Sequence, residues 1–348
     1  MATSPLSCFS ARPRPRSPGT AVWLLPAAVL LLLLNRWSHM ASYPSVSPRG
    51  SGSVQVGRAE LYSKMARDLD ERGAAFLKGG ETSQSLTLSD LFDTADDGAV
   101  VPRLKAADPP VRANVLYMDP KFAAVISKAV KDVFLPYFDQ AIWFQNTSMY
   151  HFSMFHASHH LEPIVATEDE IEAEVEAVKG VTKNLCPLKI VLDRVVLTST
   201  GVLLGLWQVE SGTDPAEIRS RLREALPRAP QKQLISINLS PDLIFFSDSM
   251  TLFCFTPRLH EFWDIPGSLK SAWKYSNHRA DNAVQSASSF DNVKFFHELV
   301  AQINEKICGF QATISELWYV EEYDVLALAL NGKMKVRRLH LGCNRQGI

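Results

Sequence analysis

Apolar side chains recur from residue 113 onward at two spacings, one typical of helices and one typical of strands. Four segments place apolar residues three or four positions apart, which forms one buried stripe along a helix. Capping residues support three of them, because Asp119 and Asp214 each precede a proline and Thr167 stands three positions before Glu170. The pattern predicts helices at 120–134, 167–179, 215–226 and 290–308.

Shorter apolar and aromatic segments predict strands between these helices. Residues 187–210 have the form of a hairpin with its turn near TSTG, and Asn331-Gly332 is a favoured two-residue turn between two later strands. Because hairpins and helices are mixed along the chain, the sequence predicts an α+β fold and not a doubly wound parallel sheet. Further strands are expected at 113–118, 141–144, 149–158, 310–322, 323–330 and 333–341.

The N-terminal part has a different composition. Residues 1–20 form a basic tail rich in Pro and Ser, and an apolar run follows at 21–34. That run is shorter than the roughly 20 residues that span a bilayer, and the residues after it form a poor cleavage site. We expect 21–37 to be an uncleaved signal anchor or transmembrane segment, with a cleaved signal peptide or an organellar transit peptide as alternatives.

This interpretation predicts a single-pass membrane protein whose C-terminal domain faces the lumen of the endomembrane system. The alternative location is the chloroplast or the mitochondrion. Sequons at Asn146 and Asn238 are compatible with a luminal domain. Residues 38–110 are expected to form a linker with one helix at 58–77, followed by a folded domain at 111–348.

Overall composition limits the classes of function. The chain has 348 residues, 46% of them hydrophobic, which is enough for a sizeable core. Its net charge of −1 argues against an extended nucleic-acid-binding surface, although a small cleft could accept an RNA end. The sequence contains no CxxC pair, so it does not indicate a zinc site. Cys186, Cys254, Cys308 and Cys343 can form disulfides or remain buried thiols, and no oligomeric state follows from the sequence.

The segment YHFSMFHASHH, residues 150–160, holds four of the nine histidines. On a strand, His151 and Ser153 point to the same side. A histidine can transfer protons near neutral pH, and a serine hydroxyl can donate to a phosphate oxygen, so this pair is a candidate catalytic site. His156 and Ser158 have the same spacing, but an unbroken strand places them on the opposite face.

Two alternatives remain open for the histidines. His156, His159 and His160 could bind zinc or copper, but adjacent side chains on a regular strand cannot both reach one ion. The cluster could also be a polar loop rim without chemistry. Trp318 and Tyr319 are expected to pack within a strand, in preference to forming a platform for nucleobases.

The order of elements around this H-x-S strand resembles the two-histidine phosphoesterase superfamily of RNA ligase and cyclic phosphodiesterase-like proteins. The matching pieces are the strand VLYM, the helix after Asp119-Pro120, YHFSMF, and the helix and hairpin that follow. The closing helix and strands also match. More narrowly, residues 113–345 resemble plant proteins labelled as an RNA ligase/cyclic nucleotide phosphodiesterase family.

The resemblance implies two pseudo-symmetric lobes of antiparallel sheet with helices on the outer faces. Each lobe of the superfamily offers one H-x-[ST] motif to a shared cleft, and members act on cyclic phosphates, usually without metal. Carried over, His151 is the base or acid and Ser153 is a phosphate ligand. The implied ligand is a small cyclic-phosphate nucleotide or an RNA end, with no cofactor.

The chain departs from this pattern in the region where the second motif belongs. His260 and His278 are the histidines there, and neither is followed two positions later by Ser or Thr. We hypothesise that residues 233–285 are an insertion or an aberrant segment. Three functions therefore stand: a membrane-anchored cyclic phosphodiesterase, a catalytically degenerate binding domain of the same fold, and an unrelated luminal module that binds a metal or a partner.

Overall fold

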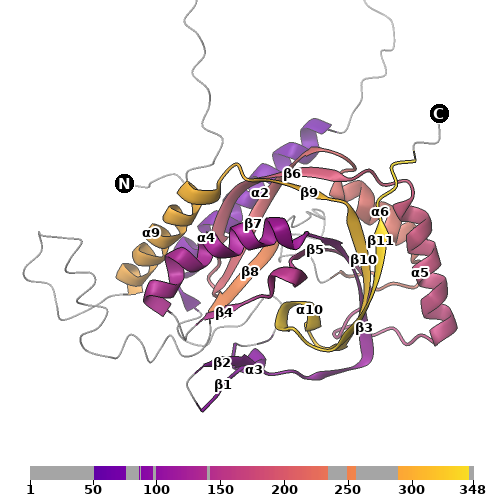
Figure 1. The fold of residues 1–348 in the computed structure, drawn as a ribbon, viewed down its shortest axis with the longest axis horizontal. Coiled ribbons are helices and arrows are strands. Elements are labelled where there is room, and N and C mark those ends of the chain that lie inside the picture. Colours follow the sequence, from indigo (N-terminus) through magenta and orange to yellow (C-terminus); the bar gives the residue numbers. More distant parts are fainter. Residues whose placement is uncertain are drawn as a thin grey trace, which may run out of the picture.

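The computed structural model describes residues 51–75, 86, 88–96, 99–138, 142–233, 249–255 and 289–344. These residues form two antiparallel sheets of four and five strands, a small two-stranded sheet, and helices packed against the large sheets (Figure 1). The α+β class with antiparallel sheets is therefore confirmed. The two-stranded sheet pairs β1 (Phe92–Thr94) with β2 (Val100–Pro102), after the short helix α3 (Leu88–Leu91).

The four-stranded sheet has the order β11-β10-β3-β5. The histidine-rich strand β5 and the last strand β11 are its two edges, and every neighbouring pair is antiparallel. Segments from both ends of the described chain thus lie side by side in one sheet. Its strands are β3 (Ala106–Tyr117), β5 (His151–Ser158), β10 (Glu316–Asp324) and β11 (Met334–His340).

The five-stranded sheet has the order β4-β8-β7-β6-β9. The predicted hairpin forms its centre as β6 and β7, and β8 lies between β7 and the short β4. None of these five strands contains a histidine. They are β4 (Ile142–Phe144), β6 (Leu188–Leu197), β7 (Val202–Ser211), β8 (Ser249–Phe255) and β9 (Gln311–Ile314).

The four predicted helices are present, with ends within a few residues of the expected ones. The capping box of α5 is formed, because the Thr167 hydroxyl accepts from the Glu170 main chain at 3.3 Å and the Glu170 carboxylate accepts from Thr167 N at 2.8 Å. Pro136 does not stop α4 and lies in its last turn. The helices are α4 (Pro120–Phe138), α5 (Glu168–Thr182), α6 (Pro215–Ala225) and α9 (Ser289–Ile307).

The helix predicted at 58–77 is α2 (Ser51–Arg72), which begins earlier in the chain. The Tyr62 hydroxyl donates to the main-chain oxygen of Trp207 at 2.5 Å, and Tyr62 packs with Leu206 on β7. This contact ties α2 to the five-stranded sheet. Helices α4 and α9 also lie against this sheet. Helices α5 and α6 contact the four-stranded sheet instead (Figure 1).

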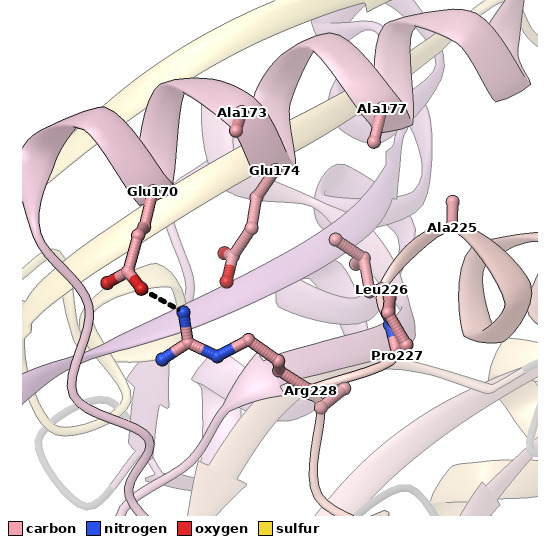
Figure 2. A pocket seen from close by; sticks show the side chains of 9 residues that line it. Glu170, Ala173, Glu174, Ala177, Ala225, Leu226, Pro227 and Arg228 are labelled. Carbon is pink, nitrogen blue, oxygen red and sulfur yellow. Dashed lines mark hydrogen bonds and ion pairs between the residues drawn. The ribbon is translucent and has the colours of Figure 1, made fainter.

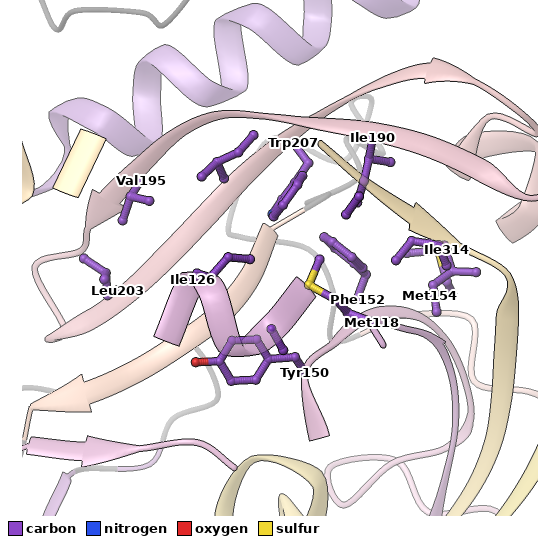
Figure 3. Close-up of a cluster of buried hydrophobic side chains, with 14 of the residues drawn as sticks. Met118, Ile126, Tyr150, Phe152, Met154, Ile190, Val195, Leu203, Trp207 and Ile314 are labelled. Atoms are coloured by element: carbon purple, nitrogen blue, oxygen red, sulfur yellow. The ribbon is translucent and has the colours of Figure 1, made fainter. Parts of the chain in front are cut away.

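One large hydrophobic core joins the two sheets. Phe152 of β5 meets Trp207 of β7 edge to face, with ring centroids 6.1 Å apart (Figure 3). Burying an aromatic side chain of this kind stabilises a fold by roughly 1.5–3 kcal/mol. The core therefore holds β5 through its apolar side chains, and the alternate side chains of the strand point to the opposite side of the sheet.

The connection between β10 and β11 differs from the prediction. Residues 327–330 form a short helix, α10 (Ala327–Leu330), and not a strand, so Asn331-Gly332 is no hairpin turn. Asn331 instead ends the helix in the left-handed conformation at φ 57°. Apolar alternation was the wrong signal, because Ala and Leu are also strong helix formers.

No helix of the described part is both long and apolar enough to cross a membrane. The longest helix, α2, carries charged residues such as Glu60, Lys64 and Arg67. The predictions of a transmembrane signal anchor, of membrane binding and of a single-pass luminal topology are therefore wrong. The apolar run 21–34 on which they rested lies outside the described residues.

Cys186, which precedes β6, forms a disulfide with Cys343, which follows β11. The chain near Cys343 is also held by main-chain hydrogen bonds, since Gly342 N donates to Thr182 O at 2.9 Å and Cys343 N to Leu185 O at 3.0 Å. Gly342 is required there because a Cβ would lie 2.7 Å from Lys183 O. The last described segment is thus fastened to the end of α5.

Candidate active site

Strand β5 enters the four-stranded sheet directly after the short 3-10 helix η2 (Thr147–Met149). In the antiparallel register, His151 lies opposite Tyr117 and Ser153 lies opposite Val115. Paired residues of an antiparallel sheet share a face, so His151 and Ser153 point to the same side as predicted. We call this side, with Tyr117, His151, Ser153, Trp318 and Arg338, the histidine face.

The tautomer of His151 follows from one contact. Its Nδ1 lies 2.8 Å from the main-chain oxygen of Met149, and a carbonyl oxygen can only accept, so Nδ1 carries the proton. Nε2 of the neutral ring is then a lone-pair acceptor, with no hydrogen-bond partner in the part of the chain that the structure describes. Burial lowers the pKa of His151, and the bond to Met149 partly opposes this. The ring is therefore neutral at pH 7, with the lone pair of Nε2 open to a proton.

Ser153 is partly buried beside His151. Its main-chain oxygen accepts from Arg219 Nη2 at 3.2 Å, and the next carbonyl, of Met154, accepts from Arg219 Nε at 3.1 Å. Arg219 is itself buried in α6, so the helix fixes the backbone of the strand. The Ser153 side chain can then present its hydroxyl on the histidine face.

The position of His156 differs from the prediction. The register shifts between Asn114 and Val115 and again between Arg112 and Ala113, so β5 contains two β-bulges. Each bulge adds one residue to the strand and reverses the alternation of faces. His156 therefore pairs with Ala113 and shares the histidine face, whereas Ser158 pairs with Arg112 on the other face. Bulges cannot be read from the alternation of a single strand.

The other histidines of this segment, His156, His159 and His160, are buried or partly buried beyond His151. Burial above all, and then the charges of His159, His160 and His151, lower the pKa of His156 to about 3. Burial and the charge of His159 lower the pKa of His160 as well. Gln233 holds the main chain of His156 on both sides, accepting from its N–H at 2.7 Å and donating to its oxygen at 3.1 Å.

The metal-binding alternative loses one of its ligands in this arrangement. His159 Nδ1 accepts from Glu162 N at 3.0 Å, so Nε2 carries the proton and donates to Lys232 O at 3.0 Å. Both ring nitrogens are thus used. Within the described residues no group of three His, Cys, Asp or Glu side chains is arranged to hold a metal ion.

The histidine face continues across the sheet as two rows of paired residues. One row runs from Ser153 through Val115 and Trp318 to Arg338, and the other from His151 through Tyr117 and Glu316 to His340. Trp318 is buried, and Tyr117 and Glu316 are partly buried. Arg338 and His340 are exposed. The sequence analysis missed Tyr117, Glu316, Arg338 and His340, because only the strand register brings them beside His151.

The opposite face of the sheet, the α5 face, carries ion pairs beside the core residues Leu116 and Phe152. Arg112 is 2% exposed and donates to both carboxylate oxygens of Glu174, at 2.9 and 3.2 Å. The Tyr319 hydroxyl donates to the same carboxylate at 2.6 Å. Arg337 of β11 pairs with Glu321 and with Glu172 of α5. Trp318 and Tyr319 are both buried within the strand, which confirms the expectation that they pack.

A pocket of about 210 Å³ lies between α5 and the chain that follows α6 (Figure 2). Alanines and the apolar chain after α6 form much of its wall, and its charged groups already have partners. Glu174 binds Arg112 and Tyr319, while Glu170 pairs with Arg228 across the mouth. The pocket therefore offers no uncommitted acid, base or nucleophile, and the histidine face is the better candidate site.

The region expected to hold the second H-x-[ST] motif is only partly described. Its central piece is β8, whose sequence SMTLFCF has no histidine. His260 and His278, and most of the hypothesised insertion at 233–285, lie outside the described residues. The described strands thus supply one H-x-S pair whose two side chains share a face, His151 and Ser153.

Comparisons with known proteins agree at the level of the fold only. No protein-family model matches the chain, and no curated protein sequence matches it. Among solved structures, TT0787 of Thermus thermophilus is similar, with a TM-score of 0.39 and 9% identity over 68% of this chain and 100% of that one. E. coli LigT in complex with phosphate has a TM-score of 0.34 and 10% identity, over 67% and 98%.

Both neighbours are members of the two-histidine phosphoesterase superfamily. With TM-scores below 0.5, the likeness carries no argument about the residues or the activity of this chain. It also tests neither the narrower resemblance to a plant family nor the missing second motif.

Proposed function

We propose that the histidine face is the active site of a phosphodiesterase that acts on 2′,3′-cyclic phosphates of nucleotides or RNA ends. The observation that carries the proposal is the state of His151. The Met149 carbonyl holds the proton on Nδ1, which leaves Nε2 as a base without a partner in the described chain. Ser153 lies on the same face, two residues along the strand.

The proposed reaction is a hydrolysis. His151 Nε2 takes a proton from water while the water oxygen attacks phosphorus, and one ester bond from phosphorus to a ribose oxygen breaks. That ribose oxygen takes a proton from solvent water, His151 returns its proton to solvent, and the product is a phosphomonoester. The Ser153 hydroxyl donates to a non-bridging phosphate oxygen and stabilises the charge that gathers there.

His151 is the histidine of this face that lies beside a serine; His340 is at the far edge of the sheet, and the pKa of His156 is lowered to about 3, so its neutral ring cannot serve as the acid. A positioned general acid for the leaving oxygen contributes about 10²–10⁴-fold to such reactions. We therefore propose slow turnover, unless residues outside the described part supply the acid. The second candidate is a domain of the same fold that binds a phosphate ligand without turnover, and the absence of histidine from the five strands of the other sheet favours it.

Hydrolysis of a 2′,3′-cyclic mononucleotide by the purified protein tests the proposal, with EDTA present. We expect measurable turnover, and a loss of about 10²-fold or more in His151→Ala. His297→Ala is the control, because His297 is partly exposed on α9 and pairs with Asp70. Binding of a 3′-phosphate nucleotide without any hydrolysis would establish the second candidate instead.

A further inference from the structure

Two neighbouring arginines on β11 have opposite surroundings. Arg337 points to the α5 face, where Glu321 and Glu172 pair with it. Arg338 points to the histidine face, and no carboxylate of the described residues lies within ion-pair distance of it. An exposed arginine without a carboxylate can bind an anion through its five N–H donors.

Arg338 is held in place by aromatic rings. Its guanidinium lies 5.0 Å from the Trp318 ring centroid, and Trp318 stacks on Tyr117 with centroids 3.7 Å apart and planes 16° apart. Trp318 Nε1 donates to Glu316 at 2.9 Å, which fixes the indole. With the indole only 2% exposed, no nucleobase can stack on it. Trp318 therefore positions the guanidinium and is not itself a platform for a ligand.

Tyr117 links this cluster to His151. Tyr117, on β3, lies directly opposite His151 of β5 on one side and opposite Glu316 of β10 on the other. Burial raises the pKa of Tyr117, and the charge of Arg338 partly opposes this. The phenol is thus protonated at neutral pH and can donate a hydrogen bond between Arg338 and the histidine. The acidic groups that face it are Asp119 and Glu316.

The spacing of the strands sets the size of the ligand. Neighbouring strands are about 4.8 Å apart, and Trp318, over which Arg338 lies, is two strands from Ser153. Arg338 itself is on β11, three strands from β5, so the guanidinium lies about 10–14 Å from the His151–Ser153 position. A single phosphate group cannot contact both places.

We infer that Arg338, resting on the Trp318 ring that also stacks on Tyr117, forms a second phosphate-binding subsite for a ligand that carries two phosphates. The inference rests on the proposed function, since it takes the first phosphate to lie at His151 and Ser153. The second phosphate can belong to the next nucleotide of an oligonucleotide or to the 5′ position of the same nucleoside. A cyclic mononucleotide would leave the subsite empty.

Equilibrium binding of three unreactive probes tests this: a nucleoside 3′-phosphate, a nucleoside 3′,5′-bisphosphate, and a short RNA with a 3′-phosphate. Arg338→Gln should leave the first unchanged and weaken at least one of the others roughly tenfold or more. The slope of the logarithm of that affinity against the logarithm of the salt concentration should fall by about one, because one fewer counterion is released. The probe that loses affinity identifies the source of the second phosphate.

Arg67→Gln removes the same charge from α2, where Arg67 is exposed and pairs with Glu71, and should change none of the three affinities. Arg338→Lys should restore part of the loss, because it keeps the charge without the planar guanidinium. The unfolding midpoint of each variant confirms that it folds.

The inference is overturned if Arg338→Gln binds all three probes like the wild type, or loses affinity for all three equally. The second result would place Arg338 at the first phosphate. Hydrolysis of the cyclic mononucleotide is measured separately, so loss of the proposed activity and loss of the second subsite are distinguishable. Selective loss of the two-phosphate probes supports the subsite even in a protein that does not turn over.

Discussion

The two faces of the four-stranded sheet carry similar residue types in opposite states. On the α5 face, Arg112 and Arg337 are matched by glutamates, and Tyr319 donates to one of those carboxylates. On the histidine face, Arg338 has no carboxylate partner and His151 has an unpartnered ring nitrogen in the described chain. Whether a charged or aromatic residue on a strand stabilises the fold or can bind a ligand thus depends on which element covers its face of the sheet.

The difference has a physical cause. Helix α5 presents Glu172 and Glu174 to one face, and a charge removed from water must be paired. No long helix of the described part presents carboxylates to the other face, where the short α10 covers one end by packing Leu328 against Val115 and Trp318. Groups near His151 therefore keep their capacity to bind a ligand.

Removing Arg112 should show the largest effect. Arg112→Met leaves the Glu174 carboxylate, 13% exposed, without its cation, and we expect a loss of about 3–5 kcal/mol in the free energy of unfolding. Urea unfolding measures it. The double variant with Glu174→Gln should recover part of the loss, because the uncompensated charge is gone. Arg338→Gln should stay within about 0.5 kcal/mol of the wild type, and an equal loss would erase the distinction between the faces.

Glu322 tests the comparison of the two faces at the end of the histidine face that α10 covers. Its side chain is buried, its carboxylate accepts from Leu328 N at 2.8 Å, and burial raises its pKa to about 7. Because the folded pKa exceeds the unfolded value of 4.5, stability is lost as pH rises from 4.5 through 7. Relative to wild type, Glu322→Gln should gain up to about 3 kcal/mol between pH 4.5 and 8.

Thermal unfolding at several pH values checks this prediction, and Glu316→Gln, on the same strand and face, controls for the loss of a charge. A pH profile of Glu322→Gln parallel to that of the wild type would contradict the assignment of the raised pKa to this carboxyl.

Ser153 should show the smallest effect of the three. If its hydroxyl donates to a phosphate oxygen, Ser153→Ala should lower kcat/KM for a cyclic mononucleotide roughly tenfold and leave stability nearly unchanged. Ser158→Ala is the matched variant from the other face, where the Ser158 hydroxyl accepts from Ile164 N at 3.0 Å. It should lose stability and keep the kcat/KM of the folded fraction, and the reverse pattern would exchange the roles of the two serines.

The sequence predicted the helices and the H-x-S pair because these depend on local periodicity. The capping signals at Thr167 and Asp214 were correct, since a cap involves only neighbouring residues. The place of His156 was wrong, because the first of the two bulges of β5, between Ser153 and Phe155, reversed the alternation before His156. The partners of Arg337 and Arg338 could not be predicted at all, because they depend on which helix covers which face.

The membrane anchor was predicted from an apolar run alone, and that prediction is wrong. The β10–β11 connection failed for a related reason, since a run of Ala and Leu was interpreted by its hydrophobicity without its helix propensity. Hydrophobic content by itself does not specify the element that carries it. Residues 233–285, as a hypothesised insertion, and the roles of His151 and Ser153 stay predictions.

The central claim is that His151 is a neutral base on a ligand-binding face. NMR of the ¹⁵N-labelled ring tests it most directly, in the free protein and with a nucleoside 3′-phosphate. The account predicts a proton on Nδ1, a titration midpoint below the usual 6.5, and a change in the Nε2 signal when the nucleotide binds. A proton on Nε2 at neutral pH, or a ring whose signals ignore the nucleotide, would contradict it.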